Sequence, residues 1–236
     1  MLEVRNLVFG YRSKQVLRDV SFVVSPGEVV SLVGDNGVGK TTLLRILATL
    51  AVPSSGLVLA DGVNAFERPL RYRRQLGYLP ENPALYEDMT VKEYLSYRAN
   101  LKGEPPKRVR RRVNEAVEMC RVAEITATPI SRLSNGLKKR VALADALLLR
   151  PRVLLLDDFL AGLDTSMRDV AGHILSEAAA FSAVIVSGHE LSDLVRWTTR
   201  FLVLRDGVVS STLTAAGIDS VELESRVRAA LKGEVS

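Results

Sequence analysis

The sequence predicts an α/β fold in which most strands of the main sheet run parallel. Residues 28–33 form an apolar run of strand length, and residues 42–47 behind it carry apolar side chains at helical spacing. Residues 153–156 are all apolar and are followed by two aspartates, which fits a central strand of a parallel sheet. Strand-like and helix-like segments alternate through much of the chain, and this alternation favours parallel strands joined by helices.

The remaining elements follow from local patterns. Turn residues mark Asp61-Gly62 and Asp206-Gly207, and residues 10–14 have the character of a hairpin turn. Thr90 is a suitable N-cap for one helix, and Pro105-Pro106 opens the next. Strands are therefore predicted at 2–9, 20–24, 57–60, 75–79, 183–186, 200–204 and 208–211, and helices at about 90–101, 105–121, 135–149, 165–180, 191–197 and 220–231.

The chain has 236 residues, which suits one large domain or a domain with an inserted lobe. Residues from about 85 to 133 show little strand pattern, so we expect them to form an inserted helical lobe. Residues 1–84 and 134–212 would then form the core, and residues from about 213 to 236 a C-terminal tail with a modest amphipathic helix.

The chain is mildly basic, with 32 Lys and Arg against 27 Asp and Glu. Part of the excess lies in two clusters, residues 71–74 and 107–112. Such clusters are usually solvated helix faces, and the alternatives are an anionic membrane surface, an acidic partner or nucleic acid. Aromatic residues do not alternate with these charges as they do in a nucleic-acid groove, so we expect no nucleic-acid partner.

Cys120 is the one cysteine of the chain, which excludes a disulfide or a multi-cysteine metal site within it and fits a reducing cytosol. The first residues lack the basic start and apolar core of a signal peptide. No apolar run reaches the ~18 residues that a membrane span needs. If the protein works at a membrane, we expect a partner to hold it there.

Residues 34–41, between the strand 28–33 and the helix 42–47, fit the pattern G-x-x-x-x-G-K-[ST]. This arrangement aims backbone N–H groups and a helix N-terminus at one anion. Lys40 supplies a point charge for the outer phosphates of a nucleotide, and the Thr41 hydroxyl suits Mg²⁺. The alternative is an ordinary glycine-rich turn with an accidental lysine. The predicted nucleotide-binding residues here are Gly34, Asp35, Asn36, Gly37, Val38, Gly39, Lys40, Thr41 and Thr42.

Asp157 and Asp158 follow the apolar strand 153–156. A parallel strand delivers its C-terminal residues to the edge of the sheet where ligands bind. We expect Asp157 to hold the Mg²⁺ of the nucleotide and Asp158 to polarise a water. The alternative is a strand cap followed by a solvated acid.

Residues 133–137 read LSNGL, and with this run the chain resembles the ATP-binding subunits of ABC transporters, whose signature motif is LSGGQ. Asn135 and Leu137 depart from it. Further matches occur in family order at Tyr11, at Glu81 in place of a glutamine, at Asp164 in the run 161–164, and at His189 in the run 187–190. The resemblance covers residues 2 to about 211. It implies an ABC ATPase fold: a P-loop nucleotidase core with a mostly parallel sheet, an antiparallel β subdomain and an inserted helical lobe.

The resemblance also implies roles for these residues. Two ATP-binding domains would pack head to tail, with Ser134 and Gly136 of one facing the ATP held by the phosphate loop of the other. Tyr11 would stack on adenine, and Glu81 would contact Mg²⁺. Asp164 would belong to the D-loop of the family and to the nucleotide-binding residues, and His189 would contact the γ-phosphate or the attacking water. From the residues alone, Ser134 could be a helix cap only, Tyr11 a surface aromatic, and His189 an ordinary surface or core histidine.

Asp158 stands where the family normally has a glutamate that orients the attacking water. The aspartate is shorter by one methylene, and a misplacement of about 1 Å can cost about a hundredfold in rate. We therefore expect normal ATP binding and slow hydrolysis, with Lys40, Asp158 and His189 as the catalytic residues.

Residues 81–91 resemble ABC-2-type exporters, in which glutamate often replaces that glutamine. This implies a polytopic membrane permease as partner, a second ATP-binding subunit that is a copy or a paralogue, and a place on the cytoplasmic face of the cell membrane. Tyr86, Met89 and Tyr94 are candidate contacts to the permease or core residues. The alternatives are a soluble ABC ATPase outside transport, and an ABC subunit in which ATP is mainly a regulatory ligand.

Overall fold

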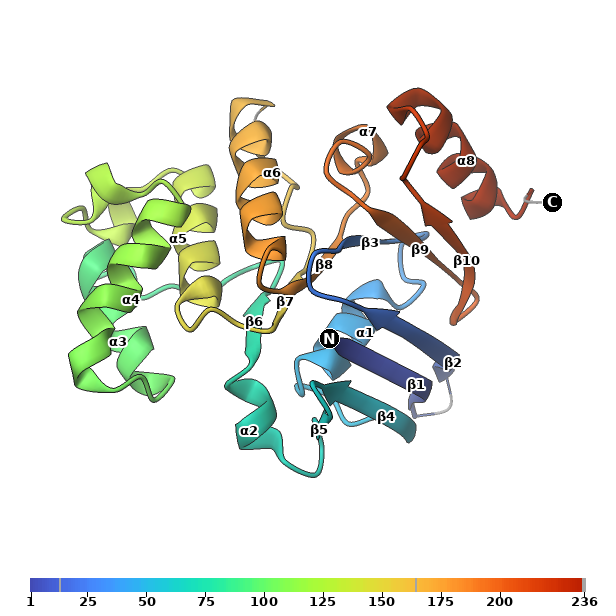
Figure 1. Ribbon diagram of the computed structural model, residues 1–236, viewed down its shortest axis with the longest axis horizontal. Helices are drawn as coiled ribbons and strands as arrows, with labels where there is room; N and C mark the ends of the chain where they lie inside the picture. The colour runs from blue at the N-terminus through green and yellow to red at the C-terminus, as the bar shows by residue number, and fades with distance from the viewer. Residues whose placement is uncertain (13, 164, 235–236) are drawn as a thin grey trace.

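The computed structural model describes residues 1–12, 14–163 and 165–234 and is built on two sheets (Figure 1). The larger sheet has six strands in the order β10-β9-β3-β8-β7-β6. Its strands are parallel from β9 to β6, and β10 pairs antiparallel with β9 at one edge. The smaller sheet is antiparallel, in the order β2-β1-β4-β5. The predicted α/β fold with a mostly parallel main sheet and a separate antiparallel sheet is confirmed.

The strands are β1 (Leu2–Tyr11), β2 (Lys14–Val24), β3 (Val29–Val33), β4 (Ser55–Ala60), β5 (Val63–Asn64), β6 (Leu76–Leu79), β7 (Val153–Leu156), β8 (Ala183–Ser187), β9 (Arg200–Arg205) and β10 (Val208–Thr214). The α-helices are α1 (Lys40–Leu47), α2 (Pro69–Arg73), α3 (Val91–Leu101), α4 (Pro106–Met119), α5 (Asn135–Leu147), α6 (Thr165–Ala179), α7 (Leu191–Leu194) and α8 (Ser220–Lys232), with short 3₁₀ turns at Ala123–Ile125 and Ile130–Arg132. None of the helices described combines the length and apolar character needed to cross a bilayer.

Strands β3, β7 and β8 are buried along their whole length, which explains their continuous apolar sequences. One hydrophobic cluster lies between the main sheet and the helices α3 to α8, and a second joins the main sheet, α1 and the antiparallel sheet. The main sheet therefore packs against hydrophobic clusters on both of its faces. The loops at its carboxyl edge begin at strands that are fixed by this packing.

Helices α3, α4 and α5 pack together at one end of the molecule (Figure 1). The Thr90 side chain accepts the Glu93 N–H, and the Glu93 carboxylate accepts the Thr90 N–H, so the predicted N-cap is a full capping box. Pro106 is the first residue of α4. Helix α5 contacts β6 as well as α3 and α4, so it links the lobe to the core. The division at residues 85 and 133 stays a prediction.

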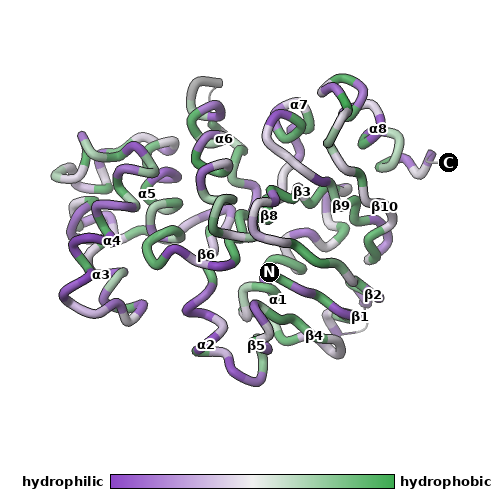
Figure 2. The backbone as a smooth tube through the Cα atoms, in the orientation of Figure 1, coloured by the Kyte–Doolittle hydropathy of each residue, from purple (hydrophilic) through white to green (hydrophobic). Residues whose placement is uncertain are grey.

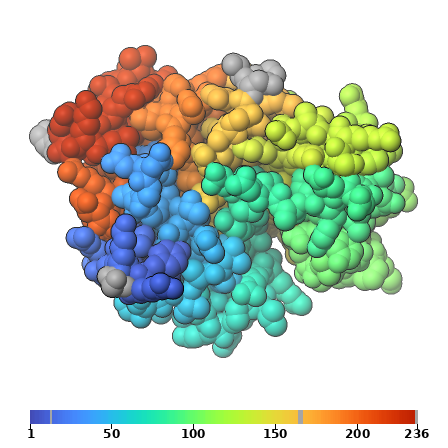
Figure 3. Space-filling view, turned by 180° about the vertical axis from the view of Figure 1, so that it is seen from behind, coloured from blue at the N-terminus to red at the C-terminus, as the bar shows by residue number. Residues whose placement is uncertain are grey.

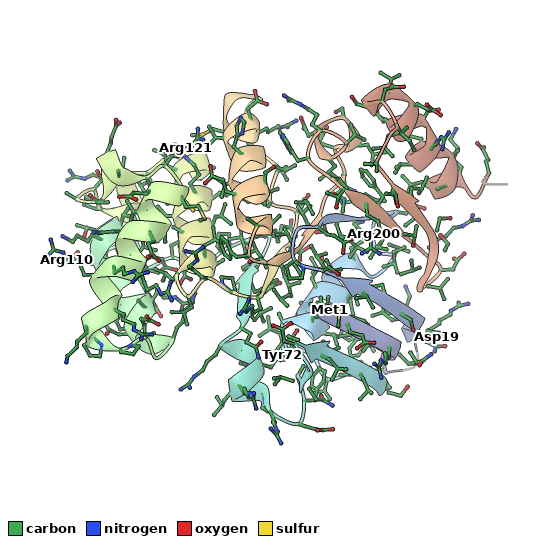
Figure 4. The ribbon with its side chains drawn as sticks, viewed as in Figure 1. Met1, Asp19, Tyr72, Arg110, Arg121 and Arg200 are labelled. Carbon is green, nitrogen blue, oxygen red and sulfur yellow. The ribbon has the colours of Figure 1, made fainter. Side chains whose placement is uncertain are left out.

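Local patterns missed α2 and β5, which lie together beside β6 and β4. Helix α2 has five residues, too few for an amphipathic period to show. The basic run of residues 71–74 includes one core residue that the sequence pattern did not indicate. Tyr72 is fully buried and donates a hydrogen bond of 2.8 Å to the Leu47 carbonyl (Figure 4). The prediction of a turn over residues 10–14 was too wide, because Gly10 and Tyr11 pair with Gln15 and Lys14 and extend the hairpin.

Tyr72→Phe should lower the free energy of unfolding by about 1–2 kcal/mol, because a buried carbonyl would lose its hydroxyl donor while the ring still fills its place. Urea unfolding compared with Tyr97→Phe, on an exposed ring, gives the measurement. Equal effects in the two variants would show that the Tyr72 hydroxyl contributes nothing.

Candidate functional site

The segments that follow β3, β7 and β8 meet at the carboxyl edge of the main sheet. They deliver the loop of residues 34–39, the pair Asp157 and Asp158, and the segment 187–189. Together they surround a cavity of about 420 Å³ lined by Asn36, Gly37, Gly39, Lys40, Thr41, Thr42, Glu81, Asp157, Asp158, Ser187 and His189.

The loop before α1 has the geometry of an anion cradle. Gly37 and Gly39 have φ values of 76° and 117°, in the left-handed region that glycine adopts without strain. A Cβ at Gly34 would lie 2.3 Å from the Leu204 carbonyl oxygen, so no side chain fits there. No side chain caps the N-terminus of α1, and its first N–H groups are left for a ligand.

Lys40 lies across this loop. Its ammonium donates hydrogen bonds to the carbonyl oxygens of Gly34, at 2.7 Å, and Asp35, at 2.9 Å. Burial lowers the pKa of Lys40, and the charges of Asp158, Asp35 and Asp157 oppose this shift. These three aspartates favour the charged form of Lys40 beside the loop. Phosphate oxygens bound there would replace the loop carbonyls as acceptors for the ammonium.

Asp157 is almost fully buried and is fixed by two hydroxyl groups. Thr41 Oγ1 donates to Asp157 Oδ1 at 3.2 Å, and Ser187 Oγ donates to the same oxygen at 2.7 Å. Both contacts use Oδ1, and no hydrogen bond to Oδ2 is formed among the described residues. A threonine hydroxyl and a carboxylate at this distance are hard oxygen donors of the kind Mg²⁺ prefers, so the pair fits this ion.

Asp158 is held by its backbone in an unusual conformation. Its φ is +46°, in the left-handed region that aspartate enters more readily than glutamate. Its N–H donates to Ser187 Oγ at 2.9 Å, so Ser187 bridges the two aspartates. His189 and Glu81 line the same cavity with exposed side chains.

Tyr11 lies outside this cavity, in the hairpin next to it. With Lys14, Val16, Arg18 and Asp206 it lines a second hollow of about 420 Å³ that also touches Gly37 and Thr42 of the loop. The ring is about half exposed and packs edge-on against Phe9, with 4.8 Å between the ring centres. A base attached to phosphates in the loop could reach this ring.

Ser134 and Gly136 do not line the phosphate cavity. They start α5, where the Ser134 hydroxyl accepts the Leu137 N–H at 3.4 Å and so caps the helix. Gly136 is partly exposed, and a Cβ there would lie at ordinary contact distance from the side chains of Met167, at 3.5 Å, and Leu163, at 3.8 Å. Asp164, predicted to be a nucleotide-binding residue of the D-loop, is outside the described residues.

The sequence patterns did not indicate two residues at the site, Ser187 and Lys139. Ser187 is the last residue of β8, and its position at a strand end was the one available signal. Lys139 donates to the Phe159 carbonyl at 3.2 Å and to that of Ala161. Burial lowers the pKa of Lys139, and the charges of Asp158 and Glu81 oppose the shift. Lys139 therefore adds a positive charge near the cavity, and only its place in the run 138–140 hinted at it.

Of the candidate permease contacts, Tyr94 fits the core alternative. It is 2% exposed and donates to Asp145 Oδ2 at 3.3 Å. Met89 is partly buried against the same core, while Tyr86 is exposed.

Comparison with known proteins matches residues 17–161 to the ABC transporter family. The chain is 34% identical over 210 residues to the uncharacterized ABC transporter ATP-binding protein YxlF of Bacillus subtilis (strain 168), covering 89% of this chain and 70% of that one. It is 33% identical to the sulfate/thiosulfate import ATP-binding protein CysA of Methylococcus capsulatus, covering 91% of this chain and 63% of that one.

Solved structures agree. The structure of an ATP-binding subunit of an ABC transporter superposes with a TM-score of 0.83 at 32% identity, covering 99% of this chain and 95% of that one. The dimeric post-hydrolysis state of the cassette MJ0796, bound to ADP and Pi, gives a TM-score of 0.79 at 25% identity, covering 92% of this chain and 100% of that one. The phosphate loop, the buried aspartate beside it and these matches agree: the chain belongs to the ABC transporter family as an ATP-binding subunit, and it is an ATPase.

Proposed function

We propose that this chain binds ATP with Mg²⁺ in the phosphate cavity and hydrolyses it to drive an ABC transporter of the ABC-2 export type. One observation supports this most. The cavity combines an anion cradle, a buried lysine, a hydroxyl–carboxylate pair and a second aspartate, whereas Ser134 and Gly136 lie outside it. A second subunit would have to supply them.

The phosphates would bind to the N–H groups of the loop and of the first turn of α1, and to the Lys40 ammonium. Thr41 and Asp157 would hold Mg²⁺, with Glu81 facing it from the other wall. The bound Mg²⁺ would offset negative charge on the phosphate oxygens. Ser187 would keep Asp157 in place, since it bonds one carboxylate oxygen and leaves the other available.

Asp158 would accept a hydrogen bond from the attacking water and align it with the γ-phosphate. His189, on the same cavity wall, would donate to the γ-phosphate or orient that water. Both side chains extend from strand ends, so their backbone is held while the side chains reach into the cavity.

The second ATP-binding subunit would present Ser134 and Gly136 to the γ-phosphate. Helix α5 points its positive end toward the face where these residues lie, and Gly136 lets a phosphate approach the backbone. The partner would be a copy of this chain or a paralogue, and the dimeric state of the cassette MJ0796 supports a two-subunit assembly.

A permease would dock at another hollow, separate from the one beside Tyr11. It has a volume of about 550 Å³ and lies between the core and the helical lobe. Glu81 lines both this hollow and the phosphate cavity, so it would connect the docked permease with the bound nucleotide. Residues 81–91 favour the export branch, while import subunits such as CysA are also among the relatives. With such a permease the chain would lie on the cytoplasmic face of the membrane.

Affinity purification of the tagged chain from gently solubilised membranes, with and without ATP, tests the proposal. Recovery of a polytopic membrane protein is the expected result, and its identity would point to the substrate. Recovery with ribosomes or nucleic acid alone would favour a soluble ABC ATPase outside transport.

Asp158→Glu should raise ATP turnover, by up to about a hundredfold, because the longer side chain would bring the carboxylate about 1 Å closer to the γ-phosphate. Asp158→Asn, which removes the charge, serves as the comparison and should lose turnover. The measurement is phosphate release at saturating Mg-ATP, with thermal unfolding recorded because glutamate fits the φ of +46° less well. A loss of turnover in Asp158→Glu at unchanged stability would show that the site is adapted to aspartate.

The same residue supports the second candidate function, in which ATP is mainly a regulatory ligand. ATP-dependent dimerisation with no turnover, measured with the permease present, would favour it over hydrolysis-driven transport.

A further inference from the structure

Helix α2 presents arginines and a leucine to solvent because its one buried residue fixes its orientation. Tyr72 is fully buried with its hydroxyl bonded to Leu47, so the neighbouring side chains point outward. Leu70 is 76% exposed, and Arg71, Arg73 and Arg74 are exposed as well. Tyr72 therefore fixes the orientation in which α2 exposes its charged and apolar side chains.

Two of these arginines lie beside further exposed leucines. Arg73 donates from Nε to Thr49 Oγ1 at 2.7 Å, and the next residue, Leu50, is 59% exposed. Arg74 extends toward the end of α3, where its Nη2 lies 3.8 Å from a Cβ built on Gly103. Leu101, two residues earlier, is 57% exposed. We define the α2 patch as Leu50, Leu70, Leu101, Arg71, Arg73 and Arg74.

The positive charge of the α2 patch is uncompensated. Within the described part of the chain, Arg71, Arg73 and Arg74 form no ion pair. Just beyond Gly103, the exposed Lys107 and Arg108 begin α4 and belong to the second basic cluster. Figure 2 shows hydrophilic residues along α2 and α4, and Figure 3 shows, from behind, a hollow between the segment of α2 and the segment near the end of α3.

Unpaired arginines alternating with exposed leucines match an anionic lipid surface better than the other anionic partners. Each arginine near such a surface adds attraction, and the leucines enter the boundary between headgroups and acyl chains. A groove for single-stranded nucleic acid would also carry aromatic rings for stacking, and the α2 patch holds none. We propose that the α2 patch docks directly on anionic phospholipid headgroups.

This contact goes beyond the proposed function, because it needs neither ATP nor a permease. Leu50 also lines the hollow proposed for the permease, so the α2 patch and that hollow face the same way. A chain held on the permease would thus lay its arginines against the lipids around it.

Flotation of the purified chain with vesicles, without a permease, tests the proposal. Vesicles of equal parts phosphatidylglycerol and phosphatidylcholine should carry the chain, and phosphatidylcholine alone should not. Each arginine is worth about fivefold in partitioning to such a surface, so Arg71→Glu with Arg74→Glu should lower it at least about 25-fold. Leu70→Ser should lower it about threefold or more.

The matched control is Arg226→Glu with Arg228→Glu on α8, which changes the net charge equally at the far end of the molecule (Figure 1). It should keep most of the binding. Equal losses in the two double variants, or equal binding to both vesicles, would overturn the proposal. The proposal would also be overturned if the chain bound a DNA duplex but no vesicles, and if Arg71→Glu with Arg74→Glu abolished the DNA binding. ATP turnover and melting temperature, measured on each variant, show separately whether the fold and the phosphate cavity are intact.

Discussion

Lys40→Ala should lower kcat/KM for ATP by about 10²–10³-fold or more, the cost of removing one preorganised donor from a site of charge development. In the structure the Lys40 ammonium is held by two loop carbonyls at 2.7 and 2.9 Å, and it faces three aspartates. When phosphates take the place of the carbonyls, this ammonium becomes their closest fixed cation. Phosphate release across a range of ATP concentrations measures the loss, and titration with a fluorescent ATP analogue shows how much of it is binding.

Lys92→Ala provides the control, since Lys92 is an exposed lysine on α3 away from the cavity. Its turnover should stay within twofold of wild type. The assignment of Lys40 would be wrong if Lys40→Ala kept its turnover within threefold while its melting temperature was unchanged.

Asp145→Asn should produce the largest loss of stability, about 3–5 kcal/mol, because it leaves two partly buried cations without their counterion. Arg98 and Lys102, both on or next to α3, contact the Asp145 carboxylate at 3.0 and 2.8 Å, and Tyr94 donates to it at 3.3 Å. This cluster joins α3 to α5, so its loss should loosen the helical lobe. Urea unfolding gives the free energy.

The pH dependence gives a second signature of the same carboxylate. Burial alone would raise the pKa of Asp145, but Lys102 and Arg98 outweigh it and hold the pKa below its usual value. Its contribution is therefore complete above the unfolded pKa of about 4 and is lost as the pH falls below that. The difference between wild type and Asp145→Asn should shrink in that range.

Glu115→Gln is the comparison, since Glu115 forms half-exposed pairs with Arg111 and Arg112 and should cost less than about 1 kcal/mol. A similar loss in the free energy of unfolding for the two variants would show that burial does not strengthen the ion pairs of Asp145.

The fold could be predicted where one local pattern decides an element. Continuous apolar runs identified β3, β7 and β8, and the cap at Thr90 and Pro106 placed α3 and α4 within a residue or two. Helix α2 could not be found, because its inward residue is one tyrosine among arginines. The hairpin of β1 and β2 is longer than its turn residues suggest, because cross-strand pairing extends through Gly10 and Tyr11.

The site was predictable where chemistry is concentrated in a motif, as in residues 34–41. Motif residues do not reveal their neighbours, however. Ser187 bonds Asp157 and the Asp158 N–H only because β7 and β8 are adjacent, and Lys139 reaches the segment after β7 only through the packing of α5. Both contacts depend on tertiary structure, which a single sequence does not display.

If a second subunit completes the phosphate site, Gly136→Glu should stop hydrolysis without stopping ATP binding. An acidic residue in the first turn of α5 is compatible with the helix, and a Cβ at Gly136 meets its neighbours at ordinary contact distance, so the fold should persist. We expect the free chain to bind a fluorescent ATP analogue within twofold of wild type, while turnover falls by at least about 10²-fold, since the new carboxylate would face the partner's γ-phosphate. Turnover that stays at the wild-type level would show that Ser134 and Gly136 do not contribute to a shared site.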